Sequence, residues 1–157
     1  MTVVAASVVA AFLAMPGRAA ASSVAVHDGM TPQQLVAFAV SQGWRAETDK
    51  QSANVTIHIG DESVHVTMLE CEAAGRCRSG IIRRITYHSL ELPNSRCHVW
   101  HWNQEAHGAT GFGPDYVTLQ RYIQFRGVND RYLRDAFDIW LRVLPSFRKL
   151  LEDCGRR

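Results

Sequence analysis

Residues 54–68 read NVTIHIGDESVHVTM. Apolar and polar residues alternate in it on both sides of the turn signal Gly60-Asp61-Glu62. The apolar positions are Val55, Ile57, Ile59, Val64, Val66 and Met68. A period of two places such residues on one face of a strand. Two runs of this kind around a short Gly-Asp turn predict an antiparallel hairpin with one buried face.

The chain before the hairpin predicts a short amphipathic helix. Thr31 can cap it, Pro32 suits its first turn, and Gln34 completes a capping box. Apolar residues then recur at helical spacing until Gly43, which ends the helix. Residues 44–47 are a candidate for the start of a strand.

The chain after the hairpin predicts three further strands and a second helix. Ser79–His88 is a third long strand. Asn94 or Ser95 can cap a helix that runs to Asn103. Tyr116–Leu119 and Tyr122–Phe125 are expected to be two strands, joined by a bend near Gln120-Arg121.

The clearest helix signal lies at the C-terminal end, where Asn129 or Asp130 is a cap and Gly155 a stop. Its apolar stripe comprises Leu133, Phe137, Trp140, Leu141, Leu144 and Phe147. At this spacing the aromatic residues are expected in the core rather than in a ligand pocket. Pro145 is expected to kink the helix or to end its first half.

These elements give the order α-βββ-α-ββ-α. Runs of antiparallel strands with helices packed on one side predict an α+β fold. The chain has 157 residues, 46% of them hydrophobic and 20% charged, which suits one globular domain. We expect residues 30–155 to form this single domain.

The N-terminus resembles a cleavable signal peptide. Val3–Met15 is uncharged and apolar, and Ala19 and Ala21 fit the small-x-small pattern of a signal peptidase site. This run is shorter than the ~20 residues that span a bilayer. It is apolar on all sides, so a buried amphipathic helix is the less favoured alternative. We therefore expect residues 1–21 to be a signal peptide that is cleaved near Ala21. Residues 22–29 are then a flexible leader. The mature protein is expected to be periplasmic or secreted, without a stable membrane span.

The chain has four cysteines, for which three complete pairings exist. Export permits disulfides, and Cys71 and Cys77 flank a short turn-like segment that a bridge would staple. Free thiols are the main alternative for this pair. A redox or zinc pair fits poorly, because the spacing is C-x5-C rather than C-x-x-C. Cys97 and Cys154 can pair only if the fold brings them together.

The formal net charge of +2 is too small to indicate a nucleic-acid partner. Four arginines, Arg76, Arg78, Arg83 and Arg84, form a local basic patch near the cysteine segment, for which a solvated surface is the ordinary explanation.

Local His and Cys density suggests one site for chemistry. The candidates are Cys97, His98, His101 and His107. A metal site needs three or four converging ligands with second-sphere support, and no HExxH or CxxC motif completes this set. The sequence also has no G-x-S-x-G elbow or phosphate loop. We therefore expect no enzyme activity, no metal and no cofactor.

Several segments together resemble the YbjN family, described as bacterial sensory transduction regulators. They are the opening helix at Thr31–Gly43, the Cys71-x5-Cys77 segment, the strand from Ser79, the stretch Val99–Gln104 (VWHWNQ) with Trp102 and Asn103, and the last helix with Trp140 and Phe147. The resemblance covers roughly Met30 to Leu151, and the chain departs from the family pattern at Thr110–Asp115.

This resemblance implies an α+β fold similar to type III secretion chaperones, and the family has no established catalytic residues. We expect a non-enzymatic, exported binding or regulatory module that docks a protein or peptide partner in the cell envelope. The alternative is an envelope metal-binding protein or small enzyme that uses Cys97, His98, His101 and His107. The sequence leaves the oligomeric state open, a homodimer included.

Overall fold

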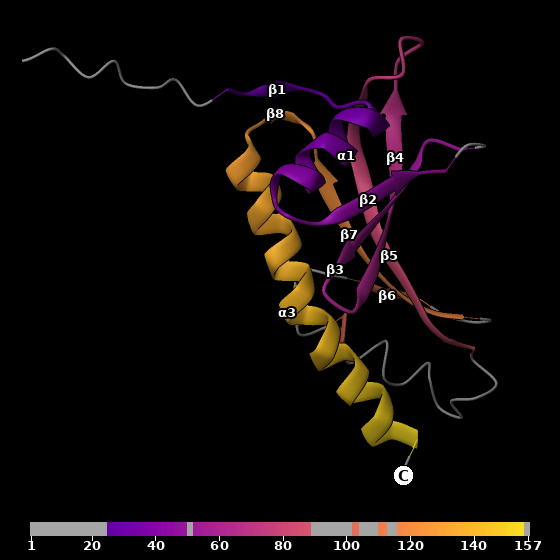
Figure 1. Ribbon diagram of the computed structural model, residues 1–157. Helices are drawn as coiled ribbons and strands as arrows, with labels where there is room; N and C mark the ends of the chain where they lie inside the picture. The colour runs from indigo at the N-terminus through magenta and orange to yellow at the C-terminus, as the bar shows by residue number, and fades with distance from the viewer. Residues whose placement is uncertain (1–24, 50–51, 89–101, 104–109, 113–115, 156–157) are drawn as a thin grey trace, which may run out of the picture.

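The computed structural model of the chain describes residues 25–49, 52–88, 102–103, 110–112 and 116–155 (Figure 1). In chain order the elements are β1 (His27–Asp28), α1 (Pro32–Ser41), β2 (Arg45–Thr48), β3 (Asn54–Ile59), β4 (Glu62–Cys71), β5 (Cys77–His88), β6 (Thr110–Phe112), β7 (Tyr116–Gln124), β8 (Arg126–Val128) and α3 (Asp130–Gly155). The α+β prediction is confirmed. Trp102 and Asn103 are helical, but the rest of the predicted second helix and the predicted signal peptide lie outside the described residues.

Among the described residues, the main sheet has six antiparallel strands in the order β2-β3-β4-β5-β7-β6. The predicted hairpin is its β3–β4 pair, in which Val55 lies opposite Val66 and Ile57 opposite Val64. Gly60, with φ of +59°, makes the turn between the two strands. This register puts all four apolar side chains on one face, and all four are fully buried.

The helices α1 and α3 pack on that face of the sheet (Figure 1). In α1 the Thr31 side chain accepts a hydrogen bond from the Gln34 amide, and the Gln34 side chain accepts one from the Thr31 amide, as the predicted capping box requires. The Phe38 ring of α1 stacks on Phe137 of α3, with ring centroids 6.3 Å apart. The two helices therefore share one core with the sheet.

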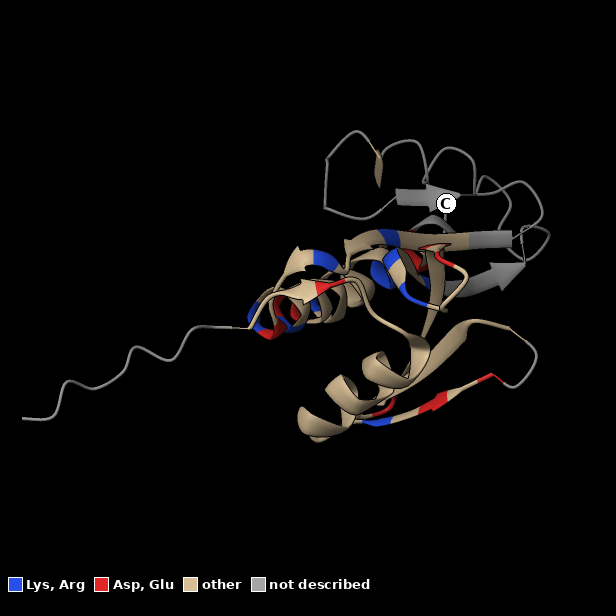
Figure 2. Ribbon diagram, turned by 90° about the horizontal axis from the view of Figure 1, so that it is seen from above, with Lys and Arg blue, Asp and Glu red and all other residues tan. Residues whose placement is uncertain are grey.

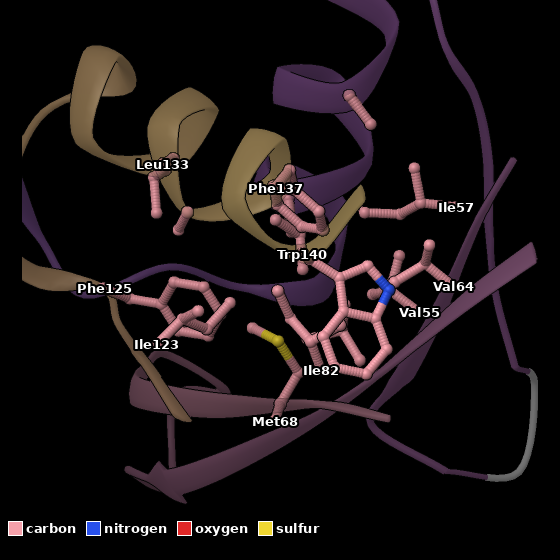
Figure 3. Packing of buried hydrophobic residues seen from close by; sticks show 14 of the residues in the cluster. Val55, Ile57, Val64, Met68, Ile82, Ile123, Phe125, Leu133, Phe137 and Trp140 are labelled. Carbon is pink, nitrogen blue, oxygen red and sulfur yellow. The ribbon is translucent and has the colours of Figure 1, made fainter. Parts of the chain in front are cut away.

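The core lies between this helical layer and the sheet (Figure 3). Trp140 extends from α3 toward the strand residues Val64 and Ile82. Gly80 of β5 lies under the Phe125 ring, where an added Cβ would lie 2.9 Å from two ring carbons. A side chain at position 80 would therefore displace the ring, which explains why a glycine stands in this strand.

The predicted bend near Gln120-Arg121 is wrong, because β7 is one continuous strand. Gln120 pairs with Arg83 and Arg121 with Ile82, so the two polar residues occupy opposite faces of the same strand. The long strand β5 provides uninterrupted partners along this stretch, and the pairing overrides the local turn signal.

The predicted leader is not wholly flexible. His27 and Asp28 form β1, which pairs with β8, and the Gly29 amide donates to the carbonyl of Phe125. Met30 exchanges two backbone hydrogen bonds with Cys77. These bonds anchor the chain from His27 onward, three residues before the start of the predicted domain.

Pro145 does not end the last helix, which continues to Gly155. Leu144, Phe147 and Leu151 are all buried on the same stripe as the residues of the first half. Proline cannot donate a backbone hydrogen bond, which weakens the helix at this position. Burial of the apolar stripe on both sides of Pro145 outweighs this loss, so the helix continues. Asn129 caps it by accepting from the Tyr132 amide at 2.9 Å, as predicted.

Candidate binding surface on the sheet

The second face of the sheet carries polar side chains, because strand residues alternate between faces. Its exposed or half-buried members include Thr56, His65, Thr67, Arg83 and Tyr122, and we call it the open face. Across it runs a row of residues in cross-strand register. From β2 to β7 the row reads Glu47, Thr56, His65, Arg83 and Gln120.

A hollow of about 690 Å³ lies over the first four residues of this row. All of its lining residues have polar side chains, and they come from β2, the segment after it, β3, β4 and β5. The lining residues are Glu47, Thr48, Asp49, Asn54, Thr56, His65, Thr67 and Arg83. A cavity of this volume is large enough for a small ligand or part of a peptide chain.

Hydroxyl groups hold the two histidines of the β3–β4 hairpin in place. His65 Nδ1 lies 3.1 Å from Thr56 Oγ1, and His58 Nδ1 lies 3.0 Å from Ser63 Oγ. Each hydrogen bond joins residues directly opposite in the register. The imidazole of His65 is therefore oriented on the wall of the hollow.

Arg83 is the unusual residue of the hollow. Its Nε is shielded from solvent and has no hydrogen-bond partner within the described part of the chain. A buried donor of this kind costs about 1–3 kcal/mol if it stays unsatisfied. A guanidinium group has five N–H donors and suits planar anions such as carboxylates. Arg83 is therefore a candidate ligand-binding residue.

The arginines of the predicted basic patch lie in different places in the structure. Arg78 pairs with Glu72 at 3.2 Å, and Arg76 donates to the carbonyl of Asp28. These contacts lie at the cysteine turn, whereas Arg83 lines the hollow. The side chain of Arg84 lies outside the described residues.

The opposite end of the hollow is acidic. β2 is an edge strand of the sheet and carries Glu47, and Asp49 follows it directly. Figure 2 shows both signs of charge on β2, whereas the neighbouring helix α1 has no charged residue. Asp49 accepts a hydrogen bond from Ser52 at 2.9 Å. The hollow thus has carboxylates at its β2 end and a guanidinium group at its β5 end.

The predicted disulfide is present: Cys71 and Cys77 are bonded and lie opposite each other at the end of the β4–β5 pair. Cys71 is exposed, whereas Cys77 is buried. The bridge closes the turn through Gly75, whose φ is +76°. The thiol and metal alternatives for this pair are therefore wrong.

The alternative site at Cys97, His98, His101 and His107 lies outside the described residues, and so does the side chain of Cys154. Within the ranges that are described, no group of three or more His, Cys, Asp or Glu residues could hold a metal ion.

The residues that carry the family resemblance lie mostly in the core. Trp102 is 3% exposed and packs edge-on against Phe147, with centroids 4.9 Å apart. Trp140 and Phe147 are fully buried, whereas Asn103 is exposed. The aromatic positions thus stabilise the fold rather than line the hollow.

The sequence alone does not single out Glu47 or Asp49, and it does not separate Arg83 from the other arginines of the basic patch. The alternation in the hairpin does predict part of the hollow, because its polar positions include Thr56, His65 and Thr67. In β5, however, the run Ile81-Ile82-Arg83-Arg84-Ile85 does not alternate, so its sequence does not show which arginine faces the hollow.

In the described part of the chain, no helix combines the length and apolar character needed to cross a membrane. No family model matches the sequence, and no curated protein or solved structure shows significant similarity to it.

Proposed function

We propose that this protein is a non-enzymatic binding module of the cell envelope, of the YbjN type, which docks a protein or peptide partner on the open face of its sheet. The proposal rests on Arg83, whose guanidinium group lines a hollow formed by polar residues and whose Nε lacks a partner among the described residues. The hydroxyl and imidazole groups beside it can exchange hydrogen bonds with a polar partner.

The location in the envelope is supported by the cysteine chemistry. Disulfides persist in exported proteins and are rare in the reducing cytosol. The Cys71–Cys77 bridge therefore agrees with the signal peptide expected at residues 1–21. Intact mass of protein recovered from the periplasm should show the loss of about 21 residues. A full-length chain confined to the cytoplasm would contradict export.

Two tyrosines offer a matched test of the docking surface. Tyr122 on the open face is 50% exposed, and Tyr132 on α3 is 40% exposed. Replacement of either one by the photo-crosslinker p-benzoylphenylalanine keeps an aromatic ring at the site. After irradiation of cells, we expect a discrete cross-linked adduct from position 122 and none from position 132.

Mass spectrometry of the adduct should identify the same peptide of one partner protein in repeated experiments. Equal adducts from both positions would indicate nonspecific contact. No adduct from position 122 would contradict docking on the open face.

A further inference from the structure

We infer that the hollow binds an extended peptide that crosses the strands, with a carboxylate of the peptide on Arg83 and a basic side chain near Glu47 and Asp49. The inference rests on the proposed function and names the class of partner. It follows from the positions of the charges along the hollow and from the geometry of the sheet.

The Arg83 end sets the first requirement. Arg83 lines the hollow, and the shielding of its Nε from solvent leaves the terminal N–H groups of the guanidinium as the donors that a ligand can meet. A carboxylate accepts from such donors with two oxygens and neutralises the charge, which makes the hydrogen bonds stronger than those to a neutral group. An acidic side chain of a peptide, or its C-terminal carboxylate, meets this requirement.

The β2 end sets the second requirement. Glu47 and Asp49 line the hollow together and create a negative potential there. A lysine or arginine side chain is favoured at such a place, and a second carboxylate is repelled. The same carboxylates disfavour inorganic phosphate and nucleic acid, which have no positive group to place beside them.

The spacing of the strands sets the distance between the two groups. Glu47, Thr56, His65 and Arg83 lie in register on four neighbouring strands. Strands lie about 4.8 Å apart, so the backbones at Glu47 and Arg83 are separated by about 14 Å. An extended peptide rises about 3.3 Å per residue, so its acidic and basic residues should lie about four positions apart.

The test uses the mature, disulfide-bonded protein and short capped peptides labelled with a fluorophore. The probe carries Glu and Lys four positions apart in a Ser/Gly background. It is made in both chain directions, and a neutral control has Gln at both positions. We expect fluorescence anisotropy to show binding of a Glu/Lys peptide and at least about tenfold weaker binding of the control.

Arg83→Gln should weaken binding of the Glu/Lys peptide by about tenfold, and Glu47→Gln by about threefold. Arg131→Gln removes the same charge from an exposed position of α3 and should leave binding unchanged. Arg83→Glu should shift the preference to a peptide with Lys in place of Glu. This exchange keeps the test valid if Arg83→Gln alters stability, since a misfolded protein would gain no new preference.

The inference would be overturned if the Glu/Lys peptide and the neutral control bound equally well, or if Arg83→Gln left the affinity for the Glu/Lys peptide unchanged. Failure of all the peptides to bind would overturn it as well. In that case a cross-linked adduct from position 122 would still support the proposed function, so the two failures are distinguishable.

Discussion

At the scale of single residues, Trp140 shows that burial and hydrogen bonding are separate contributions to stability. The side chain is fully buried, and its Nε1 has no hydrogen-bond partner among the described residues. The ring therefore contributes through apolar burial and packing, while its N–H group carries a desolvation cost.

This separation predicts unequal effects of two substitutions at the same position. Trp140→Ala should lower the free energy of unfolding by about 3–5 kcal/mol, because it leaves a large cavity. Trp140→Phe should cost less than about 2 kcal/mol, because it removes the unpaired N–H along with part of the ring. Urea titration followed by circular dichroism measures both values. Equal losses would contradict this separation of the two contributions.

At the scale of elements, the β4–β5 hairpin is closed by a covalent bond. Cys71 and Cys77 are six positions apart, and Cys77 is further held by its backbone hydrogen bonds to Met30. A loop this short limits the unfolded chain only modestly. The chain-entropy relation gives a stabilisation of about 2 kcal/mol.

We therefore expect dithiothreitol to lower the unfolding free energy of the oxidised protein by about 2 kcal/mol without unfolding it. The control is the double variant Cys71→Ala/Cys77→Ala, whose stability should not respond to the reductant. If dithiothreitol lowers the unfolding free energy of this variant by the same amount, the loss comes from a second disulfide, between Cys97 and Cys154.

The predictions of the β3–β4 hairpin and of α1, which the structure confirms, share one property. Each depends on residues that are neighbours in the chain. The β3–β4 pair follows from alternation around Gly60, and α1 follows from its capping box at Thr31. The continuity of β7 depends instead on β5, which lies about forty residues earlier in the chain. The position of Arg83 in the hollow likewise depends on the register of β4 against β5. Local patterns do not contain this information.

At the scale of the whole molecule, an ion pair joins the C-terminal helix to the hairpin turn. Arg148 on α3 donates two hydrogen bonds to Glu62, with N–O distances of 2.6 and 2.8 Å. The side chains of Arg148 and Glu62 are 30% and 23% exposed. The two residues are 86 positions apart, so no sequence pattern predicts the contact. It attaches α3, beyond Pro145, to the end of the sheet.

A double-mutant cycle with Arg148→Gln and Glu62→Gln should give a coupling energy of about 1–2 kcal/mol, since the pair is bidentate and partly shielded from water. The matched control is Arg134 and Asp138, an i,i+4 pair within α3 whose side chains are 44% and 42% exposed. Its coupling should be about 0.5 kcal/mol or less and should weaken further in 1 M salt, at which the screening length is about 3 Å. Equal coupling in the two cycles would mean that the Arg148–Glu62 pair adds no more to stability than an exposed pair within one helix.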